Sequence, residues 1–211
     1  MSRKYLIPML AFVVIAFMLA GCAALKNIQQ SVTNLQRCEF KLESVNNFAI
    51  SGIRIEDKKK LDDFSLIEGA RLTQNFAQKR LPASFILNLG VKNPNDGKGD
   101  TKSTDARLTN MDWELYIDNV ETISGSFDKE VIIPGTGREV TIPLKMELDL
   151  YNFFANRSYE NLVNLALNIG GVGGSPSKIT LYVRPIISTP FGLMNNLGRI
   201  KVVDKEWRNG Q

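Results

Sequence analysis

Hydrophobic and polar residues alternate along much of the chain after residue 37, and this period of two predicts β-strands. The clearest run spans residues 140–150, in which six apolar side chains alternate with mostly polar ones. Because successive side chains of a strand point to opposite faces, one face is predicted to be buried and the other wet. Pro143 lies inside this run and has no N–H to donate, which favours an edge strand or a bulge there.

The same alternation predicts further strands. Residues 37–56 are predicted to form two strands that are separated by a turn at Asn46 and Asn47. The pair Asp118 and Asn119 also predicts a tight turn. The remaining predicted strands lie in residues 83–93, 110–123, 127–133, 178–187 and 197–207.

Two segments have helical rather than strand periodicity. Residues 65–80 begin with Ser65 and Glu68 at the spacing of a capping box, and Pro82 follows the segment. Residues 152–168 carry apolar side chains at helical steps. The side chains expected on the buried face of the first helix are Leu66, Ala70, Thr73, Ala77 and Leu81.

Seven or eight short strands with turn signals and two inserted helices predict a mainly β fold. The pattern fits a single antiparallel β-sandwich of the immunoglobulin or fibronectin type III kind. This domain is expected to span residues 37–207, with a short tail at 208–211.

The first 21 residues differ from the rest. Arg3 and Lys4 precede an apolar run over residues 5–19, and a charged start before a short apolar core is typical of a secretory signal peptide. The run is shorter than the roughly 20 residues that a transmembrane helix needs. A signal peptide over residues 1–21 is therefore favoured over a permanent transmembrane helix.

Residues 19–22, Leu-Ala-Gly-Cys, resemble the lipobox of bacterial lipoproteins. The resemblance implies cleavage between Gly21 and Cys22, a diacylglycerol on the Cys22 sulfur and an acyl chain on the new amino terminus. The membrane would then be a partner through this lipid. Ala23 stands where enteric lipoproteins kept in the inner membrane have aspartate, which favours the outer membrane, on its periplasmic or surface face. The alternative is an ordinary signal peptide that happens to precede a cysteine.

Residues 22–36 are expected to form the lipidated tether. Leu25, Ile28, Val32 and Leu35 recur at steps of three and four residues, so a short amphipathic helix and a flexible spacer both stay open.

Composition narrows the chemistry. Histidine is absent, which excludes Ser-His-Asp and Cys-His catalysis and histidine zinc sites. With Cys22 lipidated, Cys38 has no second cysteine to pair with, so a disulfide framework is excluded. Loss of residues 1–21 lowers the net charge from +4 to +2, because Arg3 and Lys4 leave. The basic run 58–60 is followed by two aspartates, and a solvated turn is favoured over a nucleic-acid site.

Three stretches carry a family resemblance. Residues 81–95, which end in Val-Lys-Asn-Pro-Asn, residues 115–119 and residues 133–135 resemble the late embryogenesis abundant group 2 family, also called the water-stress and hypersensitive-response type. The resemblance covers roughly residues 38–206, and Asn93, Pro94 and Asn95 would be its structural turn. It implies an antiparallel β-sandwich without known catalytic residues, loosely linked to stress protection. Some relatives are suspected of binding lipids.

No motif for a reaction or a cofactor emerges. The glycine-rich stretches lack the pattern of a phosphate-binding loop, and residues 92–103 fail the ligand positions of an EF-hand. Weak calcium binding by Asp96, Asp100 and Asp105 stays as a minor alternative. We therefore expect no catalytic residue, no metal and no cofactor.

Three functional classes follow. The leading hypothesis is a membrane-anchored, non-enzymatic module that binds an envelope partner or protects the envelope under stress. The second is a periplasmic carrier of lipid or another hydrophobic ligand. The third, a hydrolase that uses only Asp, Glu, Ser or Lys, has no motif in its favour.

Overall fold

The computed structural model describes residues 37–98, 103–172, 178–189, 192–194 and 198–206. The expected signal peptide, Cys22, the tether, Asp100 and Trp207 lie outside these residues. Among the helices of the described part of the chain, none is long and apolar enough to cross a membrane.

The first sheet has four antiparallel strands in the order β2-β1-β3-β8. β8 ends this order, which explains how Pro143 is tolerated, since an edge strand needs hydrogen bonds on one side only. Pro143 lies opposite Asn88 of β3. The strands are β1 (Glu39–Ile50), β2 (Ile53–Arg54), β3 (Pro82–Lys92) and β8 (Glu139–Asp149).

The second sheet has the order β10-β9-β5-β6, and β11 also pairs with β9. Asp118 and Asn119 join β5 to β6 with φ angles of 49° and 65°, as a type I′ hairpin turn requires. A short pair, β4 with β7, completes the described strands. These strands are β4 (Ala106–Leu108), β5 (Asn110–Ile117), β6 (Val120–Phe127), β7 (Val131–Ile133), β9 (Lys178–Thr189), β10 (Gly192–Met194) and β11 (Ile200–Glu206).

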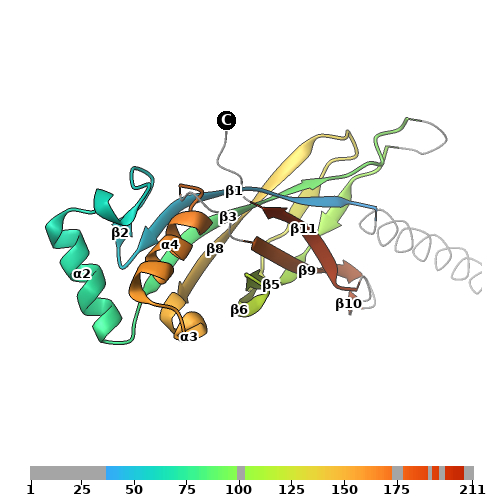
Figure 1. Ribbon diagram of the computed structural model, residues 1–211. Helices are drawn as coiled ribbons and strands as arrows, with labels where there is room; N and C mark the ends of the chain where they lie inside the picture. Colours follow the sequence, from blue (N-terminus) through green and yellow to red (C-terminus); the bar gives the residue numbers. More distant parts are fainter. Residues whose placement is uncertain (1–36, 99–102, 173–177, 190–191, 195–197, 207–211) are drawn as a thin grey trace, which may run out of the picture.

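The core lies between the two sheets, where alternate side chains of each strand meet. Leu87 and Leu89 of β3 are fully buried, as are Leu115 of β5 and Leu181 of β9. Figure 1 shows the second sheet against one half of the long first sheet, and the helices gathered at its other end. The prediction of a mainly β, antiparallel sandwich with short helices is confirmed.

The helices are η1 (Leu61–Asp63), α2 (Leu66–Ala77), α3 (Leu150–Phe154) and α4 (Tyr159–Ile169). The predicted helix over residues 152–168 is in fact two helices, because Ser158 starts a new one. Its side-chain oxygen accepts a hydrogen bond from the Asn161 amide, as an N-cap does. Leu162, Leu165 and Ile169 of α4 are buried.

The turn predicted at Asn46 and Asn47 is wrong. Both residues lie inside β1, where the register with β3 shifts between Asn46 and Ala49. Asn47 has a φ of 54°, so the strand takes up its extra residues as a bulge and continues. The chain reverses instead at Ser51 and Gly52, both with positive φ.

The predicted buried face of α2 is also wrong, except for Leu81, which follows the helix and is buried. The fully buried side chain is Leu72. Phe76, one turn further on, packs edge to face on Tyr151 and Tyr159, with ring centroids 5.4 and 5.5 Å apart. The exposed residues of α2 include Leu66, Ala70, Thr73 and Ala77. Aromatic partners from α3 and α4 therefore decided which side of α2 faces inward.

Candidate functional site

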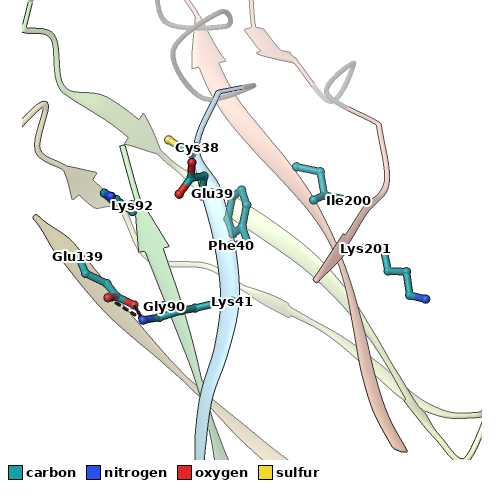
Figure 2. A pocket seen from close by; sticks show the side chains of 9 residues that line it. All are labelled: Cys38, Glu39, Phe40, Lys41, Gly90, Lys92, Glu139, Ile200 and Lys201. Carbon is teal, nitrogen blue, oxygen red and sulfur yellow. Dashed lines mark hydrogen bonds and ion pairs between the residues drawn. The ribbon is translucent and has the colours of Figure 1, made fainter. Parts of the chain in front are cut away.

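The candidate site is the seam where β1 of the first sheet runs beside β11 of the second. Among the described residues, β1 has a hydrogen-bonded neighbour on its outer side only at Ala49 and Ile50, where β2 pairs with it. The first half of β1 therefore keeps an open edge next to β11. A pocket of about 590 Å³ occupies this seam (Figure 2). Its lining residues are Cys38, Glu39, Phe40, Lys41, Gly90, Lys92, Glu139, Ile200 and Lys201.

The lining joins an apolar part to a charged part. Phe40 faces the core and is buried, and Ile200 of β11 is half-buried. Lys41, Lys92 and Lys201 are exposed. Because the pocket runs round the open edge of β1, it meets both the inward Phe40 and the outward Lys41 (Figure 2). Such a lining suits an amphipathic ligand with an acidic or polar end.

A lysine–carboxylate pair fixes one wall of the pocket. The Lys41 Nζ lies 2.7 and 2.8 Å from the two carboxylate oxygens of Glu139. The hydrogen bond to Lys41 is the main cause that lowers the pKa of Glu139, and it raises the pKa of Lys41. Both groups keep their charges at neutral pH, so this wall is an ion pair.

Gly90 makes room for this ion pair. A Cβ atom at this position would lie 2.2 Å from Oε1 of Glu139 and 2.9 Å from Cγ of Glu43. The carboxylate of Glu139 therefore rests against the bare backbone of β3. A glycine inside a strand commonly marks such a close approach.

Cys38 lies at the start of the seam and is a poor nucleophile. Burial raises the pKa of its thiol to about 12, and the charge of Glu39 adds to the effect. The thiolate is the reactive form of cysteine, and it is scarcely present at neutral pH with such a pKa. Cys38 packs with the core as a small apolar residue.

The motif at Asn93–Asn95 follows Lys92 of the pocket lining, contributes no residue to that lining and holds three segments together. The Asn93 Nδ2 donates to the carbonyls of Thr104 and Ile133, at 2.9 and 3.1 Å. The Asn93 Oδ1 accepts from the backbone N and the side-chain Nδ2 of Asn95, at 3.0 and 2.8 Å. Pro94 between them is exposed. The sequence predicted a turn here, and the structure adds a buried clamp.

Two of the three aspartates of the minor calcium alternative accept hydrogen bonds from backbone amides, and Asp100 lies outside the described residues. Asp105 accepts a hydrogen bond from the Gly135 amide at 2.8 Å, and Asp96 accepts one from the Lys98 amide at 3.1 Å. In the part of the chain that the structure describes, no three His, Cys, Asp or Glu side chains are grouped to hold a metal ion.

Sequence reasoning did not find the seam. Its two sides come from β1 and β11, which are separated by about 150 residues. Gly90 and Lys92 lie in the stretch that carries the family resemblance, and no sequence motif joins them to the other lining residues. The available signal was a strand start that mixes Cys38 and Phe40 with charged neighbours, and this pattern is common at strand edges.

Comparisons with known proteins leave the family open. No family model and no curated protein matches the chain. A solved structure, described as the crystal structure of a protein from Archaeoglobus fulgidus, matches 57% of this chain and 82% of its own, with 11% identity and a TM-score of 0.32. A likeness at this level carries no argument about fold or function.

Proposed function

We propose that the chain is a bacterial lipoprotein, anchored in the membrane through Cys22, whose β-sandwich is a non-enzymatic binding or stress-protection module of the envelope. The observation that carries this proposal is the lipobox-like stretch at residues 19–22 after a basic and apolar leader. The resemblance to the late embryogenesis abundant group 2 family supports a binding or protective role. Ala23 favours the outer membrane.

Anchoring two or more acyl chains to Cys22 would make the membrane attachment stable, since each buried methylene contributes about 0.8 kcal/mol. β1 begins at Glu39, so residues 22–36 would act as the spacer between lipid and domain.

The anchor is tested by feeding cells an alkyne-tagged fatty acid and measuring the label on the chain. We expect the native chain and a Cys38→Ser variant to be labelled and membrane-bound. A Cys22→Ser variant should lose the label completely, since its side chain offers no thiol for lipidation. Equal labelling of the Cys22→Ser and native chains would contradict the anchor, as would an unlabelled native chain.

A second candidate function is a carrier of lipid or another hydrophobic ligand, and the seam pocket favours it. The pocket volume of about 590 Å³ falls within the range of roughly 300–1,000 Å³ that is common for ligand sites. Phe40 and Ile200 offer an apolar contact, and Lys92 at the rim offers a cation for an acidic headgroup.

The carrier function is tested by native mass spectrometry of the purified chain after exchange with phospholipid. We expect about one bound lipid per native chain, and at least tenfold less for an Ile200→Lys variant, because a lysine there would put a charge into the apolar wall. Ile132→Lys is the matched control, since Ile132 is 50% exposed on β7 and lies outside the pocket lining. Equal lipid on the Ile200→Lys and Ile132→Lys variants would rule out the seam as the site.

A further inference from the structure

α2 presents an apolar face to solvent. Leu66 and Ile67, in its first turn, are 94% and 76% exposed, the highest values among the exposed large apolar residues of the described chain. With 3.6 residues per turn, Ala70 lies about 160° round the helix from the buried Leu72. The exposed face is therefore directly opposite the side that packs on the domain. Exposed apolar patches of this kind commonly mark interaction surfaces.

The two ends of this face differ in the size of their side chains. Leu66, Ala70, Thr73 and Ala77 follow one another at steps of four, three and four residues, so they form one row. The one large side chain, Leu66, stands at the amino-terminal end, and the small Ala77 stands at the carboxyl-terminal end. A second copy of this row fits best in the opposite direction, because each Leu66 then meets the small Ala77 of its partner.

The two ends of α2 also differ in charge. Residues 57–68 contain four acidic residues and three lysines, whereas residues 69–80 contain Arg71, Lys79 and Arg80 and no acid. The Asp62 side chain is 82% exposed, and Lys79 and Arg80 are exposed. An antiparallel arrangement brings the slightly acidic end of one helix to the basic end of the other, which favours association.

We propose that α2 pairs with α2 of a second copy of this chain, antiparallel about a twofold axis between residues 70 and 73. The axis places Ala70 of one protomer against the partner's Thr73, and Leu66 against the partner's Ala77. Such an interface is self-complementary, because each protomer contributes the same surface.

The strength of the pairing is limited by its size. A helix of 12 residues is only about 18 Å long, so a single helix pair buries less than the roughly 1,200 Å² of a stable interface. The dimer is therefore weak and concentration-dependent. A lipid surface is the alternative occupant, and the experiment below distinguishes it from a second copy.

Disulfide crosslinking of the full chain in cells tests the proposal. Differently tagged Ala70→Cys and Thr73→Cys chains are produced together and oxidised mildly, with the unmodified chain as the baseline. We expect mixed dimers at least fivefold above that baseline. A Leu66→Cys chain alone should stay at baseline, because antiparallel helices hold the two copies of residue 66 about 16 Å apart along the axis. A disulfide needs Cα atoms within about 7 Å.

Ile132→Cys is the matched control for random collisions, because it places a thiol on an exposed apolar position away from α2. Mixed dimers no more frequent than those of Ile132→Cys would overturn the proposal. Strong dimers of Leu66→Cys alone would show parallel pairing and would also overturn it. A dye attached to the Ala70→Cys chain that responds to phosphatidylglycerol vesicles, without any crosslink, would assign the face to lipid instead. None of these outcomes depends on the anchor at Cys22.

Discussion

The side chain of Asn93 uses both of its polar atoms inside the protein. Its amide nitrogen donates hydrogen bonds to the carbonyls of Thr104 and Ile133, and its oxygen accepts one from the backbone N–H of Asn95. The carbonyls of Thr104 and Ile133 belong to segments that are separate in sequence, and the hydrogen bond to Ile133 is buried. Buried polar groups that lose their partners cost more than the net value of the bond itself.

Replacing Asn93 by alanine should therefore lower the free energy of unfolding by about 2–4 kcal/mol, since two carbonyls lose their donor and one acceptor disappears. Urea denaturation followed by tryptophan fluorescence measures this change. Asn156→Ala serves as the control, because Asn156 is exposed and a surface substitution should change the stability by less than about 0.5 kcal/mol. A change as small as the control's would mean that the clamp adds nothing to stability.

Among the helices and strands, the sequence predicted an element correctly where a single hydrophobic pattern ran through it. β3 and β8 were predicted because their apolar positions alternate without interruption, and the pattern follows from the geometry of any strand with one buried face. α4 was predicted to be helical because apolar side chains recur at helical steps along it, and most of these side chains are buried. Its break from α3 at Ser158 was missed, since apolar steps continue on both sides of the N-cap.

The errors lie where local pattern allowed two solutions. In β1, the two adjacent asparagines are typical of a turn. They lie in a bulge instead, because β1 stays paired with β3 on both sides of them. In α2, two sides carry apolar residues, and the side with Leu72 and Phe76 was chosen because Tyr151 and Tyr159 pack against it. These tyrosines follow more than 70 residues later, so no local window contains the information.

The candidate binding seam was beyond sequence reasoning for the same reason. It exists only because β11 returns beside the open half of β1, which brings Ile200 near Phe40. Phe40 and Ile200 line the same pocket only because the topology places their strands side by side.

In the whole molecule, the seam pocket and the exposed face of α2 lie near opposite ends of β1. The seam lies near Glu39, where the chain from Cys22 enters the domain, and α2 lies at the other end of the strand (Figure 1). A strand of 12 residues extends about 40 Å. A second copy bound at α2 would therefore leave the seam open, so ligand binding and pairing can occur together.

Cys38 provides a reporter for the closure of the whole sandwich at the seam. It is only 7% exposed, and burial raises the pKa of its thiol to about 12 from an ordinary value of 9.0. The folded state therefore keeps the proton to higher pH than the unfolded chain does. The corresponding stabilisation is complete below about pH 9, and it is lost as the pH rises from 9 towards 12, because the unfolded thiol ionises first.

The free energy of unfolding of the native chain should thus fall between pH 9 and pH 11 more steeply than that of a Cys38→Ala variant. Both chains share every tyrosine and lysine that titrates in this range, so the difference between their curves isolates the thiol. Urea denaturation at each pH measures the two curves, and the rate of thiol labelling at pH 8 gives a second readout. Labelling should need opening of the seam and so should slow when a ligand fills the pocket. Parallel stability curves for the two chains, together with fast labelling of the native one, would show that the seam is open at Cys38 and that the two sheets do not shield it.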